Sequence, residues 1–229
     1  MQETTVMQKH PSKLSDSAGF SLIELMVAMG ITLVVMVIAS TILGQALNVR
    51  TRENERTEAL SDVQRALNIM SREIANAGFG LNSATTNGIV AADSTTGTTF
   101  DAGGNLVNAK IRIRANLDAF TEATPRTDDS DEDVVYTITN NGSQRLITRY
   151  DVNTGIVSSL ANRVDSLTFT YLNTNDTAAT GPGTASKVRI TVGVTLPAVG
   201  TPGRPGYQPA SRSQVSSEAT LRNRNLAEY

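Results

Sequence analysis

An uncharged, mostly apolar stretch from Leu25 to Val49 constrains this chain more than any other feature. A membrane-spanning helix needs about 20 mostly apolar residues, so the stretch is long enough to cross a bilayer. Glu24 stands directly before it, and a carboxylate at the membrane edge is costly unless it finds a partner. Such a partner arises if the chain is cut after Gly19. Phe20 then carries a new α-amino group close in sequence to Glu24, on the same chain or on an adjacent copy.

The run Gly19-Phe20-Ser21-Leu22-Ile23-Glu24, followed at once by apolar residues, resembles the prepilin signature of type IV pilins and type II secretion pseudopilins. The resemblance implies that a prepilin peptidase cleaves between Gly19 and Phe20, that the Phe20 amine is methylated, and that Glu24 is required for assembly. A single-pass membrane anchor or an uncleaved signal peptide is the alternative. A secretory signal peptide fits poorly because its cleavage site should follow the apolar core. Lys9 and Lys13 favour a cytoplasmic N-terminus, with the rest of the chain across the membrane.

The helix is expected to continue beyond the membrane, because Arg50–Arg56 is charged and free of glycine and proline. Apolar residues then recur at steps of three and four, which predicts one buried stripe on an otherwise polar helix. The stripe consists of Leu60, Val63, Leu67, Met70 and Ile74. Gly78-Phe79-Gly80 supplies the stop. A helix from Phe20 to Ala77 would be roughly 87 Å long at 1.5 Å per residue. A coiled coil is the alternative for the stripe, which covers little more than two heptads.

The remainder alternates apolar and polar residues, which predicts an antiparallel sheet with one buried face. The expected strands are Lys110–Arg114, a hairpin of Val134–Thr139 and Arg145–Tyr150 around Asn140–Ser143, Leu167–Tyr171, Val188–Leu196 and a last short strand at Glu218–Arg222. Ser83–Thr99 is low in complexity, and Pro197–Ser213 is expected to be an exposed loop. The predicted fold is α+β and pilin-like: a leader at 1–19, a long helix at 20–78 with its transmembrane part at about 22–47, and a β-rich globular domain at 79–229.

A second resemblance covers most of the chain beyond residue 19. Val63–Gly80, ending in Ala77-Gly78-Phe79, is similar to the helix end of PilW-type minor pilins and of the related minor pseudopilin GspJ. The same order of motifs follows at Asp131–Tyr136, Val164–Leu172, Lys187–Ile190 and Leu221–Asn223.

The resemblance implies a minor subunit of a type IV pilus that primes assembly or caps the fibre. Its implied partners are other minor pilins, the major pilin, the prepilin peptidase, the inner-membrane assembly platform and membrane lipid. The implied location is the inner membrane, with a single pass and a periplasmic C-terminal domain, and after assembly the pilus fibre or the cell surface. A minor pseudopilin of a type II secretion system, or a membrane-anchored binding protein that never polymerises, stays open as an alternative. Motility, adhesion and DNA uptake are not separated by these residues.

Few residues are available for catalysis. The chain has no cysteine, and its single histidine, His10, would leave with the leader, so a Ser-His-Asp or Cys-His arrangement is impossible in a processed chain. We therefore expect neither an enzyme nor a cofactor. The formal net charge of −2 and the aromatic content of 4% are unlike those of a nucleic-acid-binding domain, and nucleic acid is not an expected partner.

Two charged clusters can each be interpreted either as ordinary solvated surface or as a binding site. The acidic run Asp128–Asp133 offers oxygen ligands for Ca²⁺, with Asp129, Asp131 and Asp133 as the candidates. Its spacing lacks the glycine of an EF-hand loop, and a solvated acidic loop is the better interpretation. No metal is therefore predicted. Arg204, Arg212, Arg222 and Arg224 are either a basic patch for DNA or surface adhesion, or ordinary surface arginines.

Overall fold

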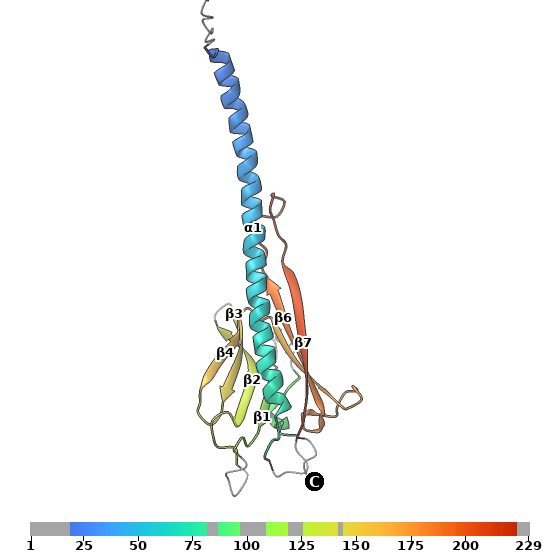
Figure 1. The fold of residues 1–229 in the computed structure, drawn as a ribbon. Coiled ribbons are helices and arrows are strands. Elements are labelled where there is room, and N and C mark those ends of the chain that lie inside the picture. Colours follow the sequence, from blue (N-terminus) through green and yellow to red (C-terminus); the bar gives the residue numbers. More distant parts are fainter. Residues whose placement is uncertain (1–18, 82–86, 97–108, 119–125, 142–143, 224–229) are drawn as a thin grey trace, which may run out of the picture. The chain divides into compact units, whose positions relative to one another are not determined.

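The computed structural model describes residues 19–81, 87–96, 109–118, 126–141 and 144–223. Residues 1–18, which are the expected leader without Gly19, lie outside this part of the chain. So do part of the low-complexity segment, the hairpin-turn residues 142–143 and Arg224. Across the described ranges, one long helix, α1 (Leu22–Ala75), comes first and is followed by seven strands and two short 3₁₀ helices (Figure 1). The chain forms two compact units, divided within α1 between Gln45 and Ala46.

The strands form two antiparallel sheets in the second unit. The first has the order β1 (Lys110–Arg114), β2 (Asp133–Asn141), β3 (Gln144–Asp151) and β4 (Val157–Ala161). The second has the order β5 (Ser166–Leu172), β6 (Lys187–Leu196) and β7 (Ser211–Thr220). The 3₁₀ helices η1 (Ala91–Asp93) and η2 (Pro182–Thr184) lie in the connections. The predicted α+β architecture, with a long N-terminal helix packed on antiparallel sheet, is confirmed.

Two details of the strands differ from the expectation. β4, with the sequence Val-Ser-Ser-Leu-Ala, was not predicted, because three of its five residues are exposed and the pattern carries little apolar alternation. β7 begins at Ser211, inside the segment expected to be a loop, and ends at Thr220 instead of Arg222. It pairs with β6 along its whole length, from Lys187↔Thr220 to Leu196↔Ser211. Backbone pairing therefore determines this serine-rich edge strand, whose side chains are largely exposed.

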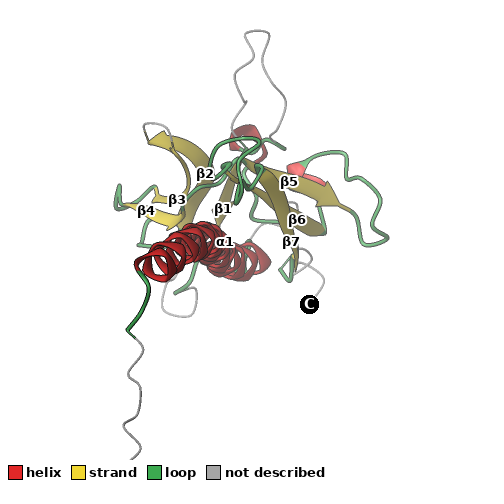
Figure 2. Ribbon diagram, turned by 90° about the horizontal axis from the view of Figure 1, so that it is seen from above, coloured by secondary structure: helices red, strands yellow, loops and turns green. Residues whose placement is uncertain are grey.

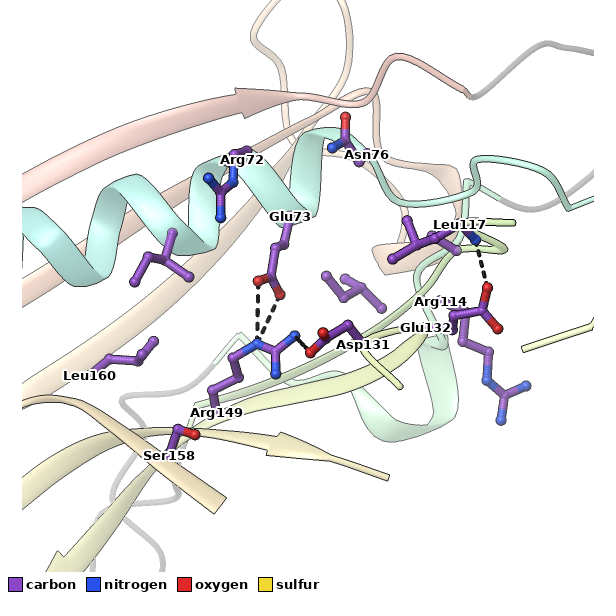
Figure 3. Close-up of a pocket in the computed structure, with 13 residues that line it drawn as sticks. Arg72, Glu73, Asn76, Arg114, Leu117, Asp131, Glu132, Arg149, Ser158 and Leu160 are labelled. Carbon is purple, nitrogen blue, oxygen red and sulfur yellow. Dashed lines mark hydrogen bonds and ion pairs between the residues drawn. The ribbon is translucent and has the colours of Figure 1, made fainter. Parts of the chain in front are cut away.

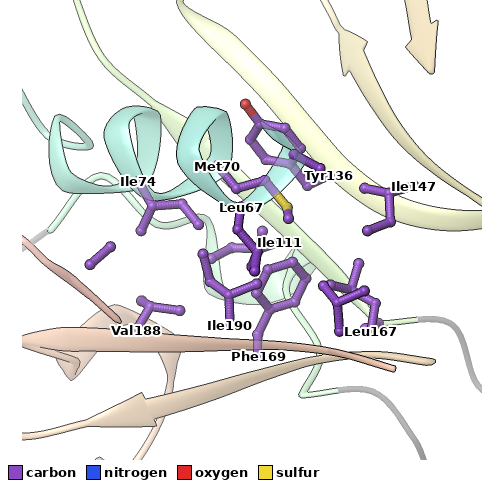
Figure 4. Packing of buried hydrophobic residues seen from close by; sticks show 14 of the residues in the cluster. Leu67, Met70, Ile74, Ile111, Tyr136, Ile147, Leu167, Phe169, Val188 and Ile190 are labelled. Carbon is purple, nitrogen blue, oxygen red and sulfur yellow. The ribbon is translucent and has the colours of Figure 1, made fainter. Parts of the chain in front are cut away.

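The C-terminal part of α1 lies over the seam between the two sheets (Figure 2). Small residues on its buried face, Ala59 and Ala66, let the strands approach the helix closely. Larger residues of α1 fill the space between the sheets (Figure 4). From the first sheet they meet Ile111, Tyr136 and Ile147, and from the second Leu167, Phe169, Val188 and Ile190. One hydrophobic core is thus shared by the helix and both sheets.

A close approach of two glycines follows the helix. Gly78 and Gly88 both have positive φ, at 81° and 77°. The Gly78 amide donates to the Arg114 carbonyl at 2.8 Å, and the Arg114 amide donates to the Gly88 carbonyl at 2.7 Å. The chain therefore leaves the helix in a left-handed turn and crosses the end of β1, where a side chain on Gly88 would overlap the backbone of Gly78.

Candidate functional site

The N-terminal motif occupies the first turn of α1. Gly19, Phe20 and Ser21 precede the helix, and the Leu25 amide donates to the Ser21 carbonyl at 3.1 Å. Glu24 is the third helical residue, so its negative charge lies at the positive end of the helix dipole. Ser21 and Glu24 have the Ser-x-x-Glu spacing of a capping box. The segment is accessible: the Phe20 side chain is 84% exposed, and Gly19 has open space where a Cβ would lie.

In the described part of the chain, the side chains of the apolar half of α1 are exposed. Its large side chains, from Leu22 to Val49, are 43% to 77% exposed. Within the described residues, α1 is the one helix long and apolar enough to cross a membrane, and no residue of its most apolar stretch is buried. The Thr32 and Thr41 hydroxyls donate to the carbonyls of Ala28 and Ile38 at 2.7 Å each. These hydroxyls are therefore satisfied without water, as an apolar environment requires.

The predicted stripe of five residues faces the core except at its first position. Val63, Leu67, Met70 and Ile74 are at most 2% exposed. Leu60 is half-buried, and the adjacent Ala59 takes the buried place on the helix at 3% exposure. The stripe packs against strands of both sheets within the chain, so none of the four buried residues is available for a partner.

A polar cleft opens between the C-terminal end of α1 and the first sheet (Figure 3). Its volume is about 510 Å³. Inside it, Arg149 on β3 donates to the Glu73 carboxylate at 3.1 Å and to Asp131 at 2.7 Å. The buried Tyr136 hydroxyl also donates to Glu73. Burial, together with the neighbouring Glu73 carboxylate, raises the pKa of Tyr136 well above its ordinary value. These charges bind one another, which favours a structural role for the cleft.

Asp129, Asp131 and Asp133 do not gather as a metal site. Asp131 pairs with Arg149, and Asp133 accepts from Arg112 and Arg114 at 2.7 and 2.8 Å, so two of the three candidate ligands are already engaged. Asp129 lies near other carboxylates, Asp118 and Glu132. Glu132 is 2% exposed and accepts from the amides of Leu117 and Asp129, at 2.6 and 3.2 Å. The solvated-loop interpretation holds for 128–131, which are exposed, and is wrong for Glu132 and Asp133, which are buried.

Asp133 is held ionised by its arginine neighbours. Its side chain is 4% exposed, and burial alone would disfavour the charged form. The bonds from Arg112 and Arg114 outweigh this effect, and the pKa of Asp133 lies below its ordinary value. Arg112 also bonds Asp93 at 2.6 Å, so a chain of alternating charges ties η1 to the first two strands.

The arginines near the C-terminus do not form one patch within the described chain. Arg212 and Arg222 lie at opposite ends of β7, a strand about 33 Å long at 3.3 Å per residue. Arg212 donates to the Ser166 hydroxyl at 3.1 Å, whereas the Arg222 amide donates to the Ala75 carbonyl at the end of α1. Arg204 is exposed in the connection between β6 and β7.

Sequence reasoning missed Arg52, which appeared to belong to the solvated charged run after the membrane segment. Arg52 is 7% exposed, and its guanidinium donates to the carbonyls of Pro197 and Pro209 at 2.8 and 2.5 Å and to the Ser211 hydroxyl at 3.0 Å. No local signal distinguishes it from its exposed neighbours, Arg50 and Arg56. Its partners lie about 150 residues away in sequence, as the separations of 145 to 159 residues show.

Comparison with known proteins gives one match, at the N-terminus. Residues 14–40 match the prokaryotic N-terminal methylation motif, a segment that contains the Gly19-Phe20 junction, Glu24 and the first half of the apolar stretch. No curated protein and no solved structure matches the chain significantly. The motif and the long apolar helix support a membrane-anchored structural subunit of the type IV pilin or pseudopilin class, one that a prepilin peptidase processes and that assembles with other pilins.

Proposed function

We propose that this protein is a minor subunit of a type IV pilus, which helps to prime assembly or caps the filament. The observation that carries the proposal is Glu24 in the first turn of a helix whose apolar side chains are exposed among the residues that the structure describes. A carboxylate in an apolar phase needs a cation, and the amine of a processed Phe20 is one helical turn away in sequence. Pairing between copies would align adjacent subunits, whereas pairing within one chain would not.

The first experiment is mass spectrometry of the N-terminus in cells with active prepilin peptidase. The chain should begin at Phe20 and carry one added methyl group on its amine. Gly19→Leu should accumulate in the membrane with its leader attached, because a side chain at this position obstructs the peptidase. Peptides that span Met1–Phe20 as the main species in wild-type cells would overturn the proposal.

Glu24→Leu tests assembly separately from processing. This variant should be cleaved and inserted normally, since added hydrophobicity favours the bilayer. It should be lost from sheared fibres and from complexes with other pilins when compared at equal membrane levels. A matched control is Glu53→Leu, a carboxylate of the same helix beyond the apolar stretch, which should be recovered like wild type. Equal recovery of Glu24→Leu would favour a simple membrane anchor.

A type II secretion pseudopilus is the second candidate, because its subunits carry the same N-terminal signature. Deletion of the gene separates the two systems. Loss of surface fibres supports the pilus, whereas retention of exoproteins in the periplasm with fibres intact supports the pseudopilus.

A further inference from the structure

The connection between β6 and β7 is a folded arm, which we call the β6–β7 arm (Pro197–Ala210). Val199 and Gln208 exchange backbone hydrogen bonds of 2.9 Å in both directions. Beyond them, the Arg204 amide donates to the Thr201 carbonyl at 3.0 Å. Gly200, Gly203 and Gly206 adopt positive φ, as tight turns require. The tip, residues 201–205, is exposed, and Arg204 is the single charged residue of the arm.

Arg52 fixes the base of the arm to α1. Four hydrogen bonds join its guanidinium to Pro197, Gln208, Pro209 and Ser211, which bracket the arm on both sides. A guanidinium with several fixed acceptors loses little further freedom, so the arm is held at one level of the helix. That level is three residues beyond Val49, where the uncharged stretch ends.

The arm extends toward the N-terminal end of the second unit's part of α1. Contacts between β7 and α1 run in opposite order along the two elements. The Arg222 amide meets the Ala75 carbonyl, and the Ser217 hydroxyl meets that of Ser71. Ser211 and Pro209 meet Arg52. Continuing in the same direction, the tip at 201–205 lies past Arg52, on the side of Val49.

Where Leu25–Val49 spans a bilayer, this level lies in the headgroup layer. The uncharged stretch Leu25–Val49 is about 38 Å long at 1.5 Å per residue, against a hydrocarbon thickness of about 30 Å. When the stretch is centred, Arg52 lies about 8 Å outside the hydrocarbon, and a headgroup layer is roughly 5 to 8 Å thick. A tip that extends back from Arg52 therefore lies within this layer. Arg204 and Tyr207 are residue types suited to an interface that is polar on one side and apolar on the other.

We propose that the β6–β7 arm rests on the membrane surface and that Arg204 binds the phosphate of an anionic phospholipid headgroup. The proposal relies on membrane anchoring by α1, as in the proposed function. Each arginine near an anionic surface strengthens membrane association by about five-fold.

The test uses the full chain, one copy per nanodisc, with a single fluorophore on an introduced cysteine, since the chain has no cysteine of its own. Thr201→Cys places the label at the exposed tip of the arm. Thr174→Cys places it on an exposed loop after β5, at the end of the sheet that bonds the last turn of α1. Lipids with a nitroxide headgroup should quench the label at 201 strongly and the label at 174 only at background level.

Changing the charge of the lipid, and then the charge of the arm, identifies the ligand. Replacing part of the phosphatidylcholine by phosphatidylglycerol should raise the equilibrium constant for binding of the arm to the membrane about five-fold, because Arg204 is the single charged residue of the arm. Arg204→Gln should abolish this increase, whereas Arg222→Gln, an exposed arginine at the far end of β7, should leave it unchanged.

Equal quenching at 201 and 174, or an Arg204→Gln variant that behaves like wild type, would overturn the proposal. A chain that fails to enter nanodiscs would contradict membrane anchoring itself, and with it both proposals. Entry without quenching at 201 contradicts the arm alone.

Discussion

Replacing Gly88 by alanine should destabilise the second unit far more than the same change at Gly203. Both glycines have nearly the same left-handed backbone, with φ of 77° and 78°. They differ in their surroundings. A Cβ on Gly203 would have no heavy atom within 4 Å, whereas a Cβ on Gly88 would lie 2.6 Å from Gly78 Cα and 2.5 Å from the Ala77 carbonyl carbon. The pair therefore separates backbone strain from steric overlap.

The left-handed conformation costs an alanine about 1 to 2 kcal/mol, and we expect Gly203→Ala to lower the free energy of unfolding by this amount alone. At Gly88 the overlap comes in addition. Overpacking of side chains costs about 1 to 3 kcal/mol, and backbone atoms yield less readily. The overlap must also disturb the two hydrogen bonds that join Gly78, Arg114 and Gly88, each worth about 1 kcal/mol. We expect Gly88→Ala to lose at least about 4 kcal/mol, a large part of the stability of a typical domain.

Urea denaturation of a chain that begins at Ala46, followed by circular dichroism, measures both variants against wild type. Gly88→Ala should unfold at much lower urea than Gly203→Ala with a similar slope. Similar losses for the two variants would refute the reasoning, since the strain term would then account for both. So would a loss of less than 2 kcal/mol at Gly88, because the turn would then open without disturbing the strand beside it.

Three further changes test other parts of the unit by the same denaturation assay. Leu67→Ala should cost about 2 to 5 kcal/mol because the side chain is 2% exposed, whereas the half-buried Leu60→Ala should cost under about 1 kcal/mol; equal losses would contradict the packing of the stripe. Asp133→Asn should cost about 3 kcal/mol at neutral pH. Folding lowers the pKa of Asp133, so the stability that its charge contributes is complete above about pH 4 and is lost as the pH falls through the folded pKa. The difference in unfolding free energy between Asp133→Asn and wild type should therefore shrink in acid. A difference that stays constant with pH would contradict this role of the charge. Arg52→Ala should cost only about 1 to 3 kcal/mol, since water can hydrate the exposed arm carbonyls in place of the guanidinium. It should also speed hydrogen exchange of the Val199 and Gln208 amides, because the arm loses its attachment to α1. Unchanged exchange would show that Arg52 does not hold the arm.

Elements with strong periodicity were predictable from the sequence. The α1 stripe and β6 illustrate this, because apolar residues at steps of three and four, or of two, leave one way to bury them. In β6, Val188, Ile190, Val192, Val194 and Leu196 are all buried. The division into two sheets was not predictable, because alternation fixes which face of a strand is buried and not which strand it pairs with.

The polar interactions could not be predicted from the sequence, for a different reason. Arg52, Glu73 and Arg149 each find partners far away in sequence, and an arginine that is buried by tertiary contacts looks like any other in a charged run. The edge strand β4 and most of the edge strand β7 were not predictable, because their stability comes from backbone pairing with a neighbour. By contrast, the Gly19–Glu24 motif could be recognised from the sequence, because its residues are adjacent in the chain.

The two halves of α1 show where a partner must supply the missing contacts. In the second unit, the stripe from Val63 to Ile74 is buried by the chain's own sheets, and the buried carboxylates Glu132 and Asp133 have donors within the domain. The core of this unit is therefore closed by the chain's own strands. In the first unit, apolar side chains remain exposed along the helix, at an energetic cost of about 25 cal/mol for each Å² left in water. Lipid or other helices must cover them. Because Glu24 is the one charge within this apolar surface, a helix that leaves lipid for a filament would gain most from a partner that also neutralises this carboxylate.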